Sequence, residues 1–258
     1  MNTPTTTPTT PQGTPRAAGE NGAAWTVPPK VIPNLDELVI EDGKPVDNIF
    51  VEKQRRLLTE PLYASWAGPG EGRPFVVFSN VGLFYAWRQS PLCPDIMLAL
   101  DVRWGDDLSI RENRSYFAWI RNKVPDVVIE TVSDQTGDED TYKLSQYANW
   151  GIPYYVIFDP EEHLGKGVLR AFVLHGGVYE PTAAALFPTV GLGLTLWSGE
   201  YEGQKGEWLR WHDRDGRLIL TGHERAEQER QRAEQLEAEI ARLRALLESK
   251  DRPQQSQP

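Results

Sequence analysis

The sequence predicts an α/β fold with a core of one helix, three strands, a second helix and a further strand, followed by antiparallel hairpins and a C-terminal coiled-coil helix. Three observations lead to this prediction. Residues 125–158 contain a strand, a helix and a strand in succession, the pattern of a β-α-β unit with neighbouring parallel strands. Short apolar runs separated by turn residues indicate further strands on both sides. Residues 223–250 carry apolar residues at heptad spacing.

The composition indicates one domain of medium size with an appendage at each end. The chain has 258 residues, of which 40% are hydrophobic and nine are Trp, enough for a substantial core. Thr, Pro, Gly and Ala dominate its beginning, and such a segment buries too little apolar surface to fold. We therefore predict a disordered Thr/Pro-rich tail over 1–30, a domain over 31–221, a coiled coil over 222–250 and a disordered end over 251–258.

The cysteine content and the lengths of the apolar runs indicate the cellular compartment of the protein. A single cysteine, Cys93, excludes a disulfide framework and any zinc site with several thiolates, and it agrees with a reducing cytoplasm. No apolar run approaches the roughly 20 residues of a membrane span, and the N-terminus lacks the apolar stretch of a signal peptide. We therefore expect a cytoplasmic protein without a membrane partner.

The net charge of −10 argues against a general nucleic-acid coat protein, because phosphate contacts need clustered Lys and Arg. The excess of acids lies in residues 31–221, the predicted domain. Action on DNA stays open, since carboxylates that hold divalent cations turn the local field positive.

The first predicted elements are a helix over 48–66 and two strands over 75–78 and 83–87, which we expect to pair with each other. The helix carries Glu52, Arg55 and Arg56. We expect these three side chains to form a solvated charged face; a metal-binding role for the glutamate is the alternative.

The next strand, 94–101, is apolar with an acid near each end. Asp101 is expected to face solvent or to cap a turn. Asp95 follows a proline, so it is either a turn residue or a functional carboxylate. The polar segment 103–123 then mixes Arg and Lys with aromatic residues, and it is either a solvated insertion or a phosphate-facing surface.

The strand 125–133 carries the most informative residue, Glu130. A carboxylate inside an apolar strand costs several kcal/mol unless a metal, a cation or hydrogen bonds compensate it. The acidic turn that follows leads into a helix over 141–150 with Lys143, and then into a strand over 153–158. The acids of the turn are expected to be turn and N-cap residues, with supporting roles beside a site as the alternative: Asp134, Asp138 and Asp140.

Several spaced residues match a known signature together: Pro125-Asp126-Val127-Val128-Ile129-Glu130-Thr131-Val132-Ser133, Asp140, Lys143, Tyr147, Gly151-Ile152, Tyr155 and Asp159-Pro160. This set resembles the Uma-type family of bacterial restriction-endonuclease-like proteins, which belongs to the PD-(D/E)XK nuclease superfamily. The resemblance covers roughly residues 35–200. It implies a restriction-endonuclease-like core and a DNA endonuclease that hydrolyses phosphodiester bonds of duplex DNA with Mg²⁺ or Mn²⁺.

The resemblance also assigns site residues. Asp95 and Glu130 would be catalytic carboxylates that bind the metal, and Lys143 would be the catalytic lysine. The superfamily lysine sits two residues after the acid, where this chain has Val132, and within this family it lies on the following helix. Asp126 is the rival first acid, but four strand residues at ~3.3 Å place its Cα atom about 13 Å from that of Glu130, too far to share an ion.

Beyond residue 160 the pattern is antiparallel, with strands over 168–174 and from 178, and a final hairpin over 207–220 that turns at 213–216. The heptad residues that follow are Leu236, Ile240, Leu243 and Leu247. They predict a coiled-coil homodimer, with a helix folded back on the domain as the alternative. A catalytically inactive nuclease-fold module that acts in binding or assembly is the second functional hypothesis.

Overall fold

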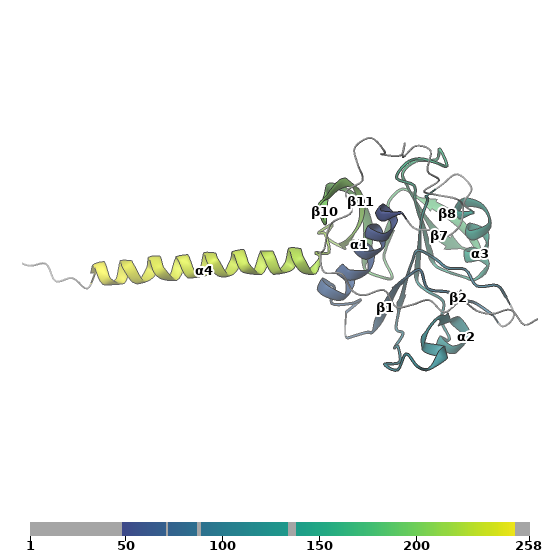
Figure 1. Cartoon of the computed structure of the whole chain (residues 1–258), viewed down its shortest axis with the longest axis horizontal. Coiled ribbons are helices and arrows are strands. Elements are labelled where there is room, and N and C mark those ends of the chain that lie inside the picture. Colours follow the sequence, from purple (N-terminus) through teal and green to yellow (C-terminus); the bar gives the residue numbers. More distant parts are fainter. Residues whose placement is uncertain (1–47, 71, 87–88, 134–137, 251–258) are drawn as a thin grey trace, which may run out of the picture. The chain divides into compact units, whose positions relative to one another are not determined.

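The computed structural model describes residues 48–250 except 71, 87–88 and 134–137, and these belong to one compact unit (Figure 1). The predicted tail over 1–30 and the predicted end over 251–258 lie outside the described residues. A six-stranded mixed sheet forms the centre, in the order β1-β3-β5-β6-β7-β8. Its strands are β1 (Phe75–Ser79), β3 (Ile96–Leu100), β5 (Val127–Thr131), β6 (Tyr154–Phe158), β7 (Leu169–His175) and β8 (Val178–Thr182).

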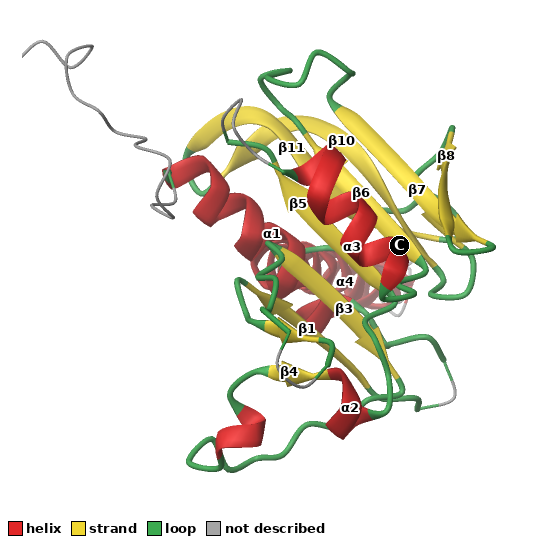
Figure 2. Ribbon diagram, turned by 90° about the vertical axis from the view of Figure 1, so that its right-hand side faces the viewer, coloured by secondary structure: helices red, strands yellow, loops and turns green. Residues whose placement is uncertain are grey.

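The pairing of β5 with β6 is parallel, and every other neighbouring pair in this sheet is antiparallel. The predicted β-α-β unit is therefore present. Its connection begins with a π-helical turn, η3 (Glu139–Lys143), and continues as α3 (Leu144–Asn149), so the helix starts before the predicted residue 141. Figure 2 shows α3 lying over the central strands.

One face of the sheet is covered by α1 (Ile49–Ser65) and by a small antiparallel sheet in the order β11-β10-β9. The strands of this second sheet are β9 (Leu186–Phe187), β10 (Leu192–Tyr201) and β11 (Gln204–Asp213). The helix starts where the side chain of Asn48 accepts a hydrogen bond from Val51 N at 2.9 Å, a normal N-cap. Leu58 and Leu62 on its buried face are completely enclosed by this first core.

The other face is covered by α3 and by a short parallel pair, β2 (Leu83–Phe84) and β4 (Tyr116–Phe117). Two single turns flank β4: η2 (Arg111–Asn113) and α2 (Ala118–Arg121). Buried side chains from β2, β4, α2 and α3 join the central strands in a second core: Leu83, Tyr116, Ala118 and Tyr147.

One strand prediction is wrong in its pairing. The strand expected over 83–87 does not pair with β1; β1 pairs with β3, and β2 pairs with β4. Short apolar runs offered several partners, and only packing on the central sheet selects one. The hairpin predicted over 207–220 with its turn at 213–216 is confirmed by the antiparallel bridge between His212 and Leu218 and by the hydrogen bond from Asp213 N to Arg217 O at 2.8 Å. Its first strand, β11, also pairs with β10 in a second hairpin, which turns after Tyr201.

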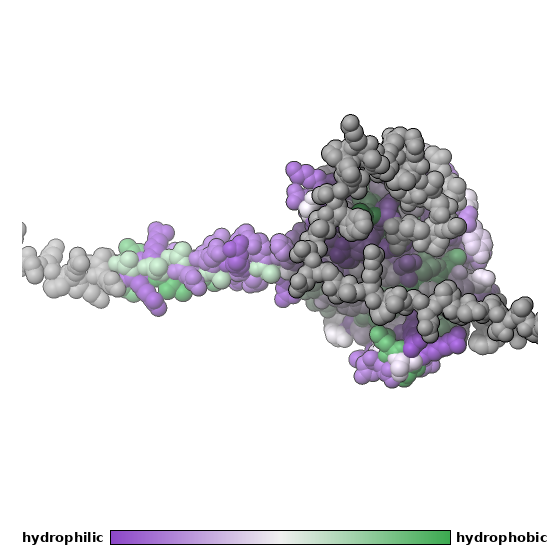
Figure 3. All heavy atoms as spheres, in the orientation of Figure 1, coloured by the Kyte–Doolittle hydropathy of each residue, from purple (hydrophilic) through white to green (hydrophobic). Residues whose placement is uncertain are grey.

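The last element, α4 (Gly222–Lys250), begins with a reciprocal capping arrangement. Glu224 N donates to Thr221 Oγ1 at 3.1 Å, and Thr221 N donates to Glu224 Oε2 at 2.8 Å. The same carboxylate forms an ion pair with Arg210, which is 2% exposed on β11. In Figure 3 the hydrophobic side chains of α4 gather in its C-terminal half. No helix in the described part of the chain is long and apolar enough to cross a membrane.

Candidate active site

Asp95 lies immediately before β3, opposite Glu130 of β5. The two strands pair with Ile96 facing Ile129, and continuing that antiparallel register by one residue brings the two acids side by side. Asp95 is 7% exposed, and its Oδ2 accepts a hydrogen bond from Thr131 N at 2.6 Å. The chain thus ties the start of β3 to the end of β5 through this carboxylate.

The second partner of Asp95 is Arg55 from α1. Its Nε donates to Asp95 Oδ1 at 2.9 Å, and its Nη2 contacts the same oxygen. The prediction that Arg55 belongs to a solvated face is therefore wrong. Arg55 follows Val51 by four residues and precedes Leu58 by three, so it shares the buried face of the helix, and that spacing was available as a signal.

Glu130 is 1% exposed and faces α3, because Val128 and Val132 at two-residue spacing also belong to the second core. Its Oε1 accepts a hydrogen bond from Tyr147 Oη at 2.6 Å, and its Oε2 lies 3.0 Å from Lys143 Nζ. Burial raises the pKa of Glu130 to about 7, although the Lys143 charge works in the opposite direction. The carboxylate is thus held near its titration point at neutral pH.

Lys143 reaches from η3 back to the sheet and bridges two carboxylates. Its Nζ lies 3.0 Å from Glu130 Oε2 and 3.0 Å from Glu139 Oε1. Burial lowers the pKa of Lys143, but attraction by the two carboxylates outweighs burial and raises that pKa above its ordinary value. The lysine therefore keeps its proton at neutral pH.

Sequence reasoning did not identify Glu139 as a site residue. This side chain is 8% exposed, and its Oε2 is buried without a hydrogen-bond partner among the residues that the structure describes. Tyr155 Oη donates to the Glu139 carbonyl at 2.7 Å and fixes the π-helical turn. Glu139, Lys143 and Tyr147 follow one another at four-residue steps, which place side chains on one helix face. This spacing indicates Glu139 only if the helix starts at residue 139, and the sequence predicted a start at residue 141.

The remaining acidic candidates have structural partners. Asp126 accepts a hydrogen bond from Leu100 N at 2.7 Å and pairs with Lys123, at the opposite end of β5 from Glu130. Asp140 pairs with two basic side chains, Lys166 and Arg170. Asp138 precedes η3 without a side-chain capping bond, and Asp134 lies outside the described residues.

The donor set fits a hard divalent cation. Carboxylate oxygens carry two lone pairs each, and Asp95 Oδ2 and both oxygens of Glu130 accept one protein hydrogen bond each, so these three oxygens retain acceptor capacity; Asp95 Oδ1 already has two contacts with Arg55. The buried Glu139 Oε2 adds an oxygen with no hydrogen-bond partner in the described chain. Among the residues that the structure describes, no group of three or more His, Cys, Asp or Glu side chains is placed to hold a metal ion. Mg²⁺ needs only one or two carboxylates, because it keeps several waters and binds substrate phosphate.

Comparison with known proteins identifies the family of this chain. The model of the Uma2 family, described as "Putative restriction endonuclease", matches residues 38–190, which is more than half of the chain. No curated protein and no solved structure matches the chain. The matched region contains Asp95, Glu130 and Lys143 together with the whole β-α-β unit. On this match the chain belongs to the Uma2 family, and its mixed α/β architecture is consistent with a restriction-endonuclease-like fold.

Proposed function

We propose that the protein is a DNA endonuclease that hydrolyses phosphodiester bonds with Mg²⁺ or Mn²⁺. The observation that carries this proposal is the convergence of Asp95 and Glu130 from neighbouring strands with the Lys143 ammonium beside them. Family membership supports the same reaction class. A buried acid with a raised pKa beside a fixed cation is an arrangement found more often at active sites than elsewhere.

Each residue has a separable role in this proposal. Asp95 and Glu130 would hold the metal ion, which supplies charge neutralisation at the phosphate and activation of water. Lys143 keeps its proton. Its ammonium would therefore donate hydrogen bonds to the phosphate, and its positive charge would stabilise the negative charge that develops there. Tyr147 and Arg55 each hold one carboxylate in place through a direct hydrogen bond.

The test is cleavage of supercoiled plasmid by purified protein with Mg²⁺ or Mn²⁺ and with EDTA. Glu130→Gln removes the charge at nearly constant shape, and Lys143→Met removes the ammonium; both are expected to abolish cleavage while the fold persists. Glu161→Gln, a carboxylate with 72% of its side chain exposed, is the matched control and should cleave normally. Cleavage by Glu130→Gln at the rate of the unaltered protein would refute the assignment.

One observation favours a different class, a catalytically inactive nuclease-fold module that acts in binding or assembly. Arg55 and Lys143 already neutralise the two carboxylates, as they would in a purely structural ion-pair network. Titration with Mn²⁺ separates the two functions. If the unaltered protein binds Mn²⁺ and the Asp95→Asn variant does not, the result supports the endonuclease. If the unaltered protein neither binds Mn²⁺ nor cleaves DNA, the result supports the inactive module.

We infer that the partner of α4 is the α4 helix of a second copy. The four apolar side chains at heptad positions of this helix are about half exposed or more: Leu236, Ile240, Leu243 and Leu247. A lone helix with such a stripe is marginal in water, so the stripe needs a cover. Heptad spacing places Ile240 and Leu247 at position a, and Leu236 and Leu243 at position d; within parallel coiled coils, Ile at a with Leu at d favours two strands.

The flanking charges favour the same parallel arrangement. In a parallel dimer, position g of one helix faces position e of the next heptad in its partner, which pairs Arg232 with Glu237 and Glu239 with Arg244 across the interface. Both pairs are attractive. The two nuclease domains would then share one end of the coil, an arrangement suited to the two strands of a duplex.

The oligomeric state is tested by light scattering of the full chain at tens of micromolar. Leu236→Asp with Leu243→Asp should convert a dimer to a monomer, and Ala238→Asp on the opposite side of the helix should not. A monomeric unaltered protein, or an Ala238→Asp variant that dissociates equally, would contradict the coiled-coil pairing.

A further inference from the structure

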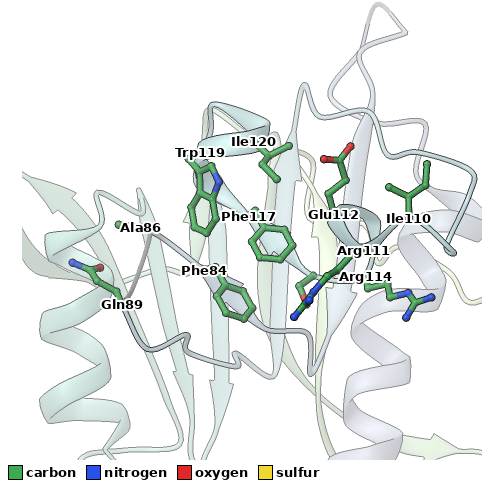
Figure 4. A pocket seen from close by; sticks show the side chains of 11 residues that line it. Phe84, Ala86, Gln89, Ile110, Arg111, Glu112, Arg114, Phe117, Trp119 and Ile120 are labelled. Atoms are coloured by element: carbon green, nitrogen blue, oxygen red, sulfur yellow. The ribbon is translucent and has the colours of Figure 1, made fainter.

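A large hollow opens beside the β2–β4 pair, on the same side of the central sheet as α3. Its volume is about 1170 Å³. This exceeds the roughly 300–1,000 Å³ of small-molecule pockets, and it suits a segment of a polymer better than a compact ligand. We call it the aromatic hollow; its principal lining side chains are Phe84, Phe117, Trp119, Ile120, Arg111 and Arg114 (Figure 4).

Three aromatic rings form one continuous side of the aromatic hollow. The ring centroids of Phe84 and Phe117 are 4.9 Å apart, and those of Phe117 and Trp119 are 5.2 Å apart. Trp119 is 39% exposed, and Ile120 beside it is equally exposed, so the row is open to a ligand. In Figure 3 hydrophobic and strongly hydrophilic surface adjoin in this part of the molecule, around α2. Exposed aromatic faces of this kind stack on unpaired nucleobases, because every base offers a flat π-face.

Two guanidinium groups complete the aromatic hollow. Arg111 reaches towards the two phenyl rings (Figure 4), and neither it nor Arg114 forms an ion pair with any residue that the structure describes. Arg114 is oriented by its donation to Leu108 O at 2.7 Å. Glu112 is the one carboxylate among the described lining residues, so the hollow has a net positive charge in a chain whose net charge is −10. An anionic partner is therefore favoured there.

A short path along the backbone joins the aromatic hollow to the candidate active site. Leu83 and Leu92 exchange two backbone hydrogen bonds, of 2.7 and 3.2 Å, and Asp95 follows Leu92 by three residues. With 3.8 Å between consecutive Cα atoms, Phe84 lies within about 20 Å of Asp95. That upper bound corresponds to about six stacked nucleotides of one strand at 3.4 Å each.

We propose that the aromatic hollow binds an unpaired segment of a nucleic-acid strand, with bases against Phe84, Phe117 and Trp119 and phosphates against Arg111 and Arg114. This proposal rests on the proposed nuclease function and extends it to the substrate. Bases inside an intact duplex are stacked on each other, so the aromatic row selects DNA that is single-stranded or locally opened near the cleaved bond. The hollow thereby distinguishes substrates by strand state and not by sequence.

The test is fluorescence anisotropy of a labelled oligothymidine and of a duplex of equal length, in EDTA so that no cleavage occurs. Oligothymidine should bind more tightly than the duplex, and equal or tighter binding of the duplex overturns the selection by strand state. Trp119→Ala should weaken oligothymidine binding by about fivefold or more, the lower end of one stacked base. Trp119→Phe keeps an aromatic ring and should stay within about twofold of the unaltered protein, and thermal unfolding checks that both variants fold. Arg111→Ala should reduce the slope of log affinity against log salt by about 0.7, one phosphate contact to a single strand.

Arg214→Ala, at the exposed turn after β11, is the matched control and should leave that slope unchanged. Absence of oligothymidine binding at tens of micromolar overturns the proposal, and so does an affinity of Trp119→Ala equal to that of the unaltered protein. The same holds if Arg111→Ala changes the slope no more than Arg214→Ala. Binding with these signatures in a protein that never cleaves DNA would keep the hollow as a strand-binding site while refuting the nuclease function.

Discussion

Glu130→Gln is expected to make the metal-free protein more stable at pH 8 while removing its activity. Glu130 is 1% exposed, and burial raises its pKa from an ordinary 4.5 to about 7. At 1.36 kcal/mol for each pKa unit, the ionised side chain therefore costs the folded state about 3 kcal/mol relative to the unfolded chain. Glutamine is neutral at every pH and avoids this cost.

The sign of the pH dependence follows from the direction of the change. Below about pH 4.5 both states of the unaltered protein carry the proton, so Glu130 has no effect on the free energy of unfolding. Between about 4.5 and 7 only the unfolded state loses the proton, and stability falls as the pH rises. Above about 7 the full cost is present. The advantage of Glu130→Gln should therefore be about 3 kcal/mol at pH 8 and small at pH 4.5.

Urea unfolding in EDTA at both pH values measures this difference, and for a domain of this size it corresponds to roughly 6–12 °C in Tm at pH 8. Glu161→Gln, at a largely exposed carboxylate, should track the unaltered protein at both pH values. A Glu130→Gln variant that is less stable at pH 8, or whose advantage is equal at both pH values, would refute the account of Glu130 as a destabilising functional acid.

Three further outcomes are expected. Asp95→Asn should weaken Mn²⁺ binding at least about tenfold in calorimetric titration, because it removes one of two anionic ligands. Tyr147→Phe removes the hydrogen bond to ionised Glu130, which raises the pKa of that carboxyl further, so the pH at which cleavage reaches half its maximum should move upward. Glu224→Ala leaves the buried Arg210 guanidinium without its carboxylate, so urea unfolding should show a loss of about 2–3 kcal/mol.

Matched control variants exist for two of these changes. Asp101→Asn alters an exposed acid paired with Arg73 and should leave Mn²⁺ binding unchanged. Glu227→Ala breaks an exposed pair with Arg230 on α4 and should cost at most about 0.5 kcal/mol. Equal effects of Asp95→Asn and Asp101→Asn, or of Glu224→Ala and Glu227→Ala, would contradict the assigned contacts.

Local patterns in the sequence were sufficient for the central elements. The pattern over 48–66 predicted α1, and the strand around Glu130, the helix with Lys143 and the following strand predicted the parallel pair β5–β6. Such patterns are informative because a buried strand or helix face must repeat apolar residues at its own period. A charge that interrupts the repeat, such as Glu130, is visible for the same reason.

Tertiary structure alone decided the surroundings of the two site carboxylates, Asp95 and Glu130. Arg55 lies forty residues before Asp95, and Glu139 becomes a neighbour of Glu130 only because a π-helical turn and Lys143 bring it there. The partner of β2 and the hairpin of β10 with β11 were likewise chosen by packing on the central sheet. Periodicity determines which face of an element is buried, but the identity of the group across the interface depends on register and layer order. Those are set by the summed burial of the whole core and not by any local segment.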